Sequence, residues 1–217
     1  MNLMLNALVI FATVLGSGMA LPQARQLAKT RQADGVSAVW VGVSLALNAW
    51  WITYALAEHV WALLPVSIVS FTLYGFMAIV FVTTIGRSSL RGLGLGVLGL
   101  GMVPLPFLIV GGWELAGVVV GLCYGLQLLP AVVAVLRTRQ LGGVSATTWL
   151  IAWVESAIWL VYGWGRDDIA LVAAGLLGVA MASVIVVRLA VTGHQPMGLF
   201  TRRAAAARWR KAQPSLS

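Results

Sequence analysis

A single carboxylate, Glu155, lies in the middle of an otherwise uncharged apolar run, residues 140–165. An ionised carboxylate at bilayer depth costs about 2.5 to 3.5 kcal/mol even on lenient insertion scales, so this side chain should face a cavity, find a partner or stay protonated. Trp159 follows it by one helical turn. Substrate hydrogen bonding or proton coupling would use such a carboxylate; the alternative is a structural hydrogen bond to a neighbouring helix.

Several other polar and aromatic side chains lie within the apolar runs. Asn48 offers an amide, and the rings of Trp51 and Trp159 offer a surface on which a sugar ring can stack. Ser67 and Thr72 offer hydroxyls, although a small hydroxyl in a membrane helix more often bonds the carbonyl of the preceding turn. The predicted substrate-binding set is Glu155, Asn48, Trp159, Trp51, Ser67 and Gln127.

Two prolines, Pro22 and Pro130, lie near the ends of two of these runs. Proline lacks an amide hydrogen and clashes with the preceding turn, so each can kink its helix. Gln23 follows Pro22, whereas Ala131 follows Pro130. We predict that Pro22, Gln23 and Pro130 form hinges; the alternative is that two helix ends simply carry a proline.

Residues suited to enzyme chemistry are sparse. Both histidines, His59 and His194, lie at the edges of apolar runs and Glu155 stands alone, so no converging catalytic group is expected. A single cysteine, Cys123, excludes an internal disulfide and a cysteine-based metal site. The last apolar run, 169–187, contains no lysine for a retinal Schiff base. We therefore expect no enzyme, no cofactor and no metal.

The overall composition favours lipid as the surrounding solvent. The chain is 60% hydrophobic and 9% charged, with a mean hydropathy of +0.95, whereas about a quarter of the residues in a soluble domain are charged. Continuous apolar windows of about 20 residues predict helices that cross the bilayer, and not the alternating strands of a barrel. Seven such windows are present: 1–24, 35–57, 59–86, 92–113, 115–136, 140–165 and 169–187.

Basic residues gather in alternate links between these windows. All but one of the 14 Lys and Arg residues lie in the first, third and fifth links and in the tail, and the opposite face carries Glu58, Glu114, Asp167 and Asp168. The positive-inside rule then places the N-terminus outside and the C-terminus in the cytoplasm of a multi-pass protein of the cell membrane. The net charge of +8 is thus a topology signal. The lipid bilayer is the expected partner, and nucleic acid is not.

Two parts of the chain repeat each other at a constant offset of 108 residues (130 minus 22). Thr-Arg-Gln followed by Gly-Val-Ser-Ala occurs at 30–38 and again at 138–146, and a Trp-x-x-Tyr pair recurs at Trp51 and Trp159. The matching basic links must share one side of the membrane, so the copies are parallel repeats. The predicted fold is an all-α integral membrane protein: seven transmembrane helices, as two parallel three-helix repeats joined by an inversion-linker helix (3+1+3).

The expected organisation has four parts: the first repeat at 1–86, the linker helix at 87–113, the second repeat at 114–192 and a basic cytoplasmic tail at 193–217. Glycines in the linker permit close helix packing within or between protomers, which leaves a homo-oligomer open. The copies differ where Leu47 matches Glu155 and where Gln23 matches Ala131. Those differences are where function is expected.

Together these motifs resemble the PQ-loop group, which includes the SWEET and MtN3/saliva sugar transporters. The features are a Leu-Pro-Gln at the end of the first window, a basic link running into Gly-Val-Ser, a Trp-x-x-Tyr pair closing the second window, and the 3+1+3 plan. The resemblance implies a transporter whose hinge prolines let two halves rock between outward-open and inward-open states. It also implies a small-molecule substrate, with a sugar as the first expectation.

The substrate remains open between a sugar and another small solute. The SWEET family typically carries an asparagine on the third helix of each repeat, and this chain has Ser67 and Gly175 at the matching positions. One alternative is a proton-coupled carrier of an amino acid or a similar solute that uses Glu155. Another is a membrane receptor or scaffold that shares the fold and does not transport.

Overall fold

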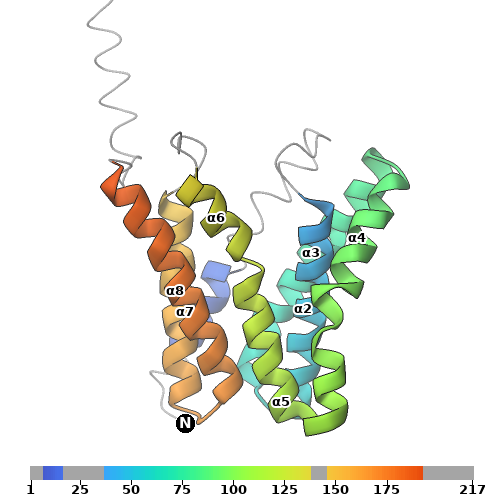
Figure 1. The fold of residues 1–217 in the computed structure, drawn as a ribbon. Coiled ribbons are helices and arrows are strands. Elements are labelled where there is room, and N and C mark those ends of the chain that lie inside the picture. Colours follow the sequence, from blue (N-terminus) through green and yellow to red (C-terminus); the bar gives the residue numbers. More distant parts are fainter. Residues whose placement is uncertain (1–6, 17–36, 138–145, 193–217) are drawn as a thin grey trace, which may run out of the picture.

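The computed structural model describes residues 7–16, 37–137 and 146–192 (Figure 1). Within these ranges every regular element is a helix. In chain order they are a helix at Ala7–Gly16, α2 (Ala38–Ala57), η1 (Trp61–Leu63), α3 (Leu64–Thr84), α4 (Ser88–Leu98), η2 (Leu100–Met102), α5 (Pro104–Leu126), α6 (Leu129–Arg137), α7 (Ala146–Trp164) and α8 (Ile169–Val191).

Four helical stretches are long and apolar enough to cross a membrane: Ala38–Ala57, Trp61–Thr84, Ser88–Arg137 and Ile169–Val191. The α7 helix has 19 residues, but Glu155 and its tryptophans lower its hydropathy. Side chains that point outward, such as Ile109 and Val110, are apolar and exposed, which suits a lipid environment. The predicted all-helical class is confirmed for the described residues, and their long apolar helices are compatible with a membrane protein.

Short polar residues fix the starts of two long helices. The Ser37 hydroxyl accepts a hydrogen bond from the amide of Trp40 at 3.4 Å and caps α2. The Asp168 carboxylate accepts from the amide of Leu171 at 3.0 Å and caps α8. Such caps satisfy amides that have no partner inside the helix, so each start is fixed by its local sequence.

The turns that follow α2 and α7 share one backbone form. His59 and Asp167, which are 108 residues apart (167 minus 59), both have a φ of 56°. In each turn the amide of the next residue bonds the carbonyl five residues back, at 2.9 Å. A positive φ outside glycine is uncommon. Its recurrence at matched positions is a structural correspondence between the two halves of the sequence.

The Ser88–Arg137 stretch turns back on itself. It contains 50 residues, and a straight helix of that length would span about 75 Å, more than twice the hydrocarbon thickness of a bilayer. Inside α5, Gly111 (φ −131°, ψ 15°) and Gly112 (φ +66°, ψ −162°) leave the helical region. The chain reverses there, as Figure 1 shows at the turn below the α5 label. The stretch therefore consists of two antiparallel limbs.

The expected linker helix at 87–113 is not one continuous helix. Its first part, α4, ends at Leu98, where Gly99 adopts a non-helical ψ of −112°, and η2 then leads into α5 at Pro104. A proline in the first turn costs no hydrogen bond, so a new helix can begin there. The apolar composition of the window gave no sign of these breaks.

Glycines bring α4 close to α2. A Cβ added at Gly42 would collide with the carbonyl of Leu93, and one added at Gly96 would collide with that of Val39. The indole nitrogen of Trp50 also donates to the carbonyl of Gly101 at 2.8 Å. Several linker glycines thus serve packing within the chain.

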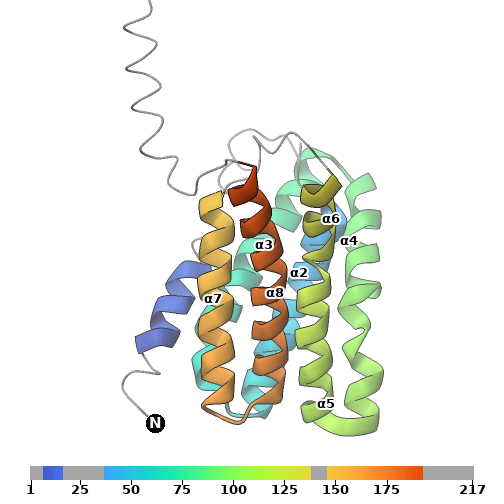
Figure 2. The same ribbon diagram turned by 60° about the vertical axis from the view of Figure 1, so that its left-hand side comes forward.

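The helices form two neighbouring groups. In one, α2 packs against α3 and α4; in the other, α8 packs against α7, α5 and α6. The helix at Ala7–Gly16 lies beside α7 (Figure 2), although it precedes α2 in the sequence. The largest buried cluster joins side chains of both groups, among them Leu47, Tyr54, Val120, Tyr162 and Leu171. The core therefore lies between the groups.

Apart from Glu155, the described charges lie in links and helix ends at the two ends of the bundle (Figure 1). The links and helix ends at one end carry Arg87, Arg91, Arg137 and Arg188. The turns at the opposite end carry Glu58, Glu114, Arg166, Asp167 and Asp168. We call these the basic end and the acidic end. Their separation matches the alternation predicted from the links.

Candidate functional site

A cavity of about 320 Å³ lies between the two groups of helices, within the size range of small-molecule sites. Its walls come from the helix at Ala7–Gly16 and from α2, α3, α5, α7 and α8. All six side chains of the predicted substrate-binding set line it: Glu155, Asn48, Trp159, Trp51, Ser67 and Gln127. The structure thus brings together residues that are up to about a hundred positions apart in the sequence.

Most of the lining residues occur in pairs separated by 108 positions, so equivalent positions of the two sequence copies face the same space. Trp51 pairs with Trp159 and Asn48 with Ser156. The other pairs are Gly16 with Tyr124, Trp40 with Thr148, Ser44 with Ala152, Leu63 with Leu171, Val66 with Ala174, Ser67 with Gly175, and Ser70 with Gly178.

Glu155 is almost completely buried, with 7% of its surface exposed. Its carboxylate lies directly against Gly16, where an added Cβ would collide with Oε1. On its own helix the indole of Trp159 serves as a hydrogen-bond partner one turn away. No Lys, Arg or His occurs among the lining residues within 7–16, 37–137 and 146–192. The carboxylate therefore lies in a mainly apolar and aromatic wall.

A second polar group lies on the opposite side, around α2. The amide nitrogen of Asn48 donates to the carbonyl of Ser44 at 2.8 Å, one turn back. The Ser44 hydroxyl donates to Oε1 of Gln127 at 3.3 Å, which links α2 to the end of α5. These groups already make hydrogen bonds within the protein, so fewer of them are available to a ligand than the sequence suggests.

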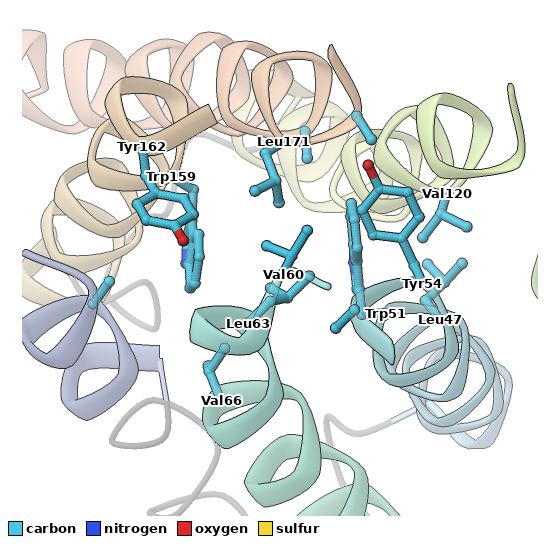
Figure 3. Packing of buried hydrophobic residues seen from close by; sticks show 14 of the residues in the cluster. Leu47, Trp51, Tyr54, Val60, Leu63, Val66, Val120, Trp159, Tyr162 and Leu171 are labelled. Carbon is cyan, nitrogen blue, oxygen red and sulfur yellow. The ribbon is translucent and has the colours of Figure 1, made fainter. Parts of the chain in front are cut away.

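The two Trp–Tyr pairs have nearly the same geometry. The ring centroids of Trp51 and Tyr54 are 5.7 Å apart with planes at 83°, and those of Trp159 and Tyr162 are 5.8 Å apart with planes at 86°. Figure 3 shows the pairs on opposite sides, with Leu63 and other aliphatic side chains between them. Edge-to-face packing is favourable for aromatic rings. Each tyrosine therefore holds its tryptophan in a fixed orientation at the cavity wall.

The acidic end of the cavity is closed by packing and by one hydrogen bond. The Tyr54 hydroxyl donates to Oδ1 of Asp168 at 2.9 Å and so joins α2 to the start of α8. Val60, Leu63 and Leu171, which Figure 3 shows in the layer between the Trp–Tyr pairs, are all nearly inaccessible. Arg166 lies over the ring of Tyr162, 5.9 Å from its centroid. This end of the cavity is sealed.

Sequence reasoning missed several lining residues, among them Trp40, Ser44, Tyr74, Tyr124 and Trp149. A helical spacing could have found some of them, because residues 40, 44, 48 and 51 follow one face of α2. The hydroxyl of Thr72, by contrast, bonds the carbonyl of Ile68 at 2.8 Å, as small hydroxyls in membrane helices often do.

The predicted hinges fall in two different places. Pro22 and Gln23 lie outside the described residues. Pro130 lies directly after an interruption, because α5 ends at Leu126 and α6 begins at Leu129. An interruption of the helix at residues 127–128 therefore precedes this proline, and its role as a hinge stays a prediction. Without an amide hydrogen, Pro130 cannot bond the carbonyl four residues earlier.

Metal binding has no candidate in this part of the chain: residues 7–16, 37–137 and 146–192 contain no group of three or more His, Cys, Asp or Glu side chains that could hold an ion. Comparison with models of protein families and with curated proteins gives no match for this chain.

Proposed function

We propose that this protein is a membrane transporter that moves a small polar solute by alternating access. The observation that carries the proposal is a cavity between two helix groups, lined by matched positions of the sequence repeat and sealed at the acidic end. Transporters built from repeats place their substrate site at the interface between the repeats. A buried carboxylate in that wall is the kind of intramembrane group that marks a substrate or ion path.

The proposed architecture has seven spans in a 3+1+3 arrangement of parallel repeats. The reversal at Gly111 and Gly112 supports it, because it turns one long stretch into two limbs. The identical turns at His59 and Asp167 and the matched Trp–Tyr pairs support an equivalence of the two halves. The limb before the reversal, together with α4, would then be the linker between the repeats.

The proposed orientation places the acidic end outside and the basic end in the cytoplasm of the cell membrane. The separation of charges between the two ends supports this orientation, because cytoplasmic loops carry an excess of Lys and Arg. The N-terminus would then be external and the C-terminal tail cytoplasmic.

In this mechanism, opening to the outside requires the acidic end to separate. The hydrogen bond between Tyr54 and Asp168 must break, and the aliphatic layer at Leu63 and Leu171 must part. The interruption before Pro130 lets α6 and α5 change their relative angle with little loss of helix hydrogen bonding. The resemblance to PQ-loop proteins adds an equivalent hinge at Pro22 and Gln23.

A sugar is the substrate that this resemblance implies, and the paired Trp51 and Trp159 offer surfaces for stacking on its ring. A second candidate is a proton-coupled carrier of an amino acid or another small solute, which the buried position of Glu155 favours. We propose that the protein is a carrier and not an enzyme. The alternative of a receptor or scaffold predicts that a solute binds without being transported.

Transport by the purified protein in proteoliposomes tests the proposal. Counterflow of radiolabelled sugars and amino acids should exceed that of protein-free vesicles. A coupled carrier should respond to an imposed pH gradient and lose that response in Glu155→Gln, whereas a uniporter should be indifferent to the gradient. Equal flux in the wild type and in Glu155→Gln would contradict both roles for that residue. Absence of flux for every solute, despite ligand binding, would favour a receptor.

A further inference from the structure

Among the described residues that line the cavity, Glu155 is the only Asp, Glu, Lys, Arg or His. With 7% of its surface exposed, it has lost nearly all contact with bulk water. A buried ion is stable only when an opposite charge and hydrogen bonds compensate for its lost hydration. In the part of the chain that the structure describes, the lining supplies the hydrogen bond from Trp159 but no positive side chain. These described residues therefore offer no cation that would pair with an ionised carboxylate.

Gly16 supplies the room for this carboxylate. A Cβ at that position would collide with Glu155 Oε1, so the glycine and the glutamate fit each other. At the matched positions of the other copy, Tyr124 and Leu47 replace the pair. The carboxylate therefore occurs in the sequence copy whose facing helix has a glycine at the point of contact. This match indicates that the space beside Gly16 fits a carboxylate.

Aromatic rings surround the same space. Those that line the cavity are Trp40, Trp51, Tyr74, Tyr124, Trp149 and Trp159. The face of an aromatic ring attracts a cation, most strongly for tryptophan and when water is excluded. Trp40 and Tyr74 are held edge to face, with centroids 5.3 Å apart. A carboxylate with several rings around it is the chemistry by which proteins bind ammonium groups.

We propose that the solute bound in this cavity is a small organic cation, with its ammonium group between the Glu155 carboxylate and the aromatic rings. This inference rests on the proposed function, since it names the substrate class of the same site. A neutral sugar would need several fixed donors and acceptors. Here the Asn48 amide and the Ser44–Gln127 pair already form internal hydrogen bonds, whereas no described lining residue offers the carboxylate a cation.

The test is a pair of probes that differ only in charge. Choline carries a permanent positive charge, and 3,3-dimethylbutan-1-ol is its neutral carbon analogue of nearly the same shape. Binding of each, and of glucose, is measured on the full chain in lipid nanodiscs by tryptophan fluorescence and by the shift in melting temperature. We expect choline to bind about tenfold more tightly than its neutral analogue, and glucose to cause no shift.

Two variants assign the effect to the carboxylate. Glu155→Gln keeps the shape and removes the charge, so choline should lose most of its advantage over the neutral analogue and keep only the part that the aromatic rings provide. Glu58→Gln removes a charge from an exposed position at the acidic end and should leave choline affinity unchanged. Tetramethylammonium, in which a methyl group replaces the hydroxyethyl group of choline, should bind with the same dependence on Glu155.

Each result decides the proposal. Equal binding of choline and its neutral analogue would overturn it, because neither the carboxylate nor the aromatic rings would then recognise the positive charge. Failure of both cations to bind, or stronger binding of glucose, would also overturn it. Glucose counterflow unaffected by choline would overturn this inference while leaving the transport function intact. Cation binding that depends on Glu155, without flux of any solute, would support the site and contradict transport.

Discussion

At the scale of single residues, the contact between Gly16 and Glu155 defines the charged wall of the cavity. Gly16→Ala would place a methyl group against the carboxylate, and an overpacked buried site costs about 1 to 3 kcal/mol. We expect a lower melting temperature in detergent and weaker ligand binding. Gly94→Ala is the matched control, because a Cβ at Gly94 meets nothing within 4 Å.

A double substitution shows whether the carboxylate causes this effect. Glu155→Ala shortens the side chain that the new methyl group would meet, so the two changes should be less than additive. Additive losses would show that Gly16 matters for another reason, such as the path of the chain that follows it.

Tyr54 forms the polar contact that closes the acidic end. Tyr54→Phe removes the donor to Asp168, and a hydrogen bond to a charged group is worth about 1.5 to 3 kcal/mol. Because Asp168 keeps its bond from the Leu171 amide, we expect a loss near the lower bound, seen as reduced thermal stability. Tyr162→Phe keeps the ring that Arg166 contacts and should cost less. Equal losses would contradict a special role for the Tyr54 hydroxyl.

At the scale of elements, the reversal inside α5 depends on Gly112. Its φ of +66° and ψ of −162° lie in a region that is open almost only to glycine, and a side chain there costs about 1 to 3 kcal/mol. Gly112→Ala should therefore lower the melting temperature, although its Cβ would meet no atom within 4 Å. The effect would be purely conformational. A neutral result would indicate that the chain does not turn at this residue.

The break between α5 and α6 is the second element whose role can be tested. Pro130→Ala restores an amide, which permits a continuous helix across residues 127–131. We expect thermal stability to stay equal or rise while the initial rate of counterflow falls several-fold. Pro106→Ala is the control, because Pro106 lies in the first turn of α5, where a missing amide costs little. Unchanged flux would contradict the hinge.

At the scale of the whole molecule, much of the fold could be predicted from where the charges are absent. The apolar windows predicted long helices. The lone carboxylate of Glu155 and the recurring tryptophans singled out Glu155, Trp51 and Trp159, which line the cavity; their role in binding stays a prediction. The breaks at Gly99 and Gly112 were not, because glycine permits a turn without requiring one. Tyr74 and Tyr124 were missed because their approach to the cavity depends on helix packing, which a linear spacing does not contain.

The separation of charges leads to a test of orientation for the intact protein. Cys123 is buried and can be replaced by serine to give a background without cysteine. In that background, Asp167→Cys marks the acidic end and Ser88→Cys the basic end, both at exposed positions. A maleimide that cannot cross membranes should label Asp167→Cys in intact cells and Ser88→Cys only after permeabilisation, because basic links stay in the cytoplasm. The reverse pattern would invert the orientation and keep the fold. Labelling of both positions from outside would contradict a bundle whose two ends lie on opposite sides of the membrane.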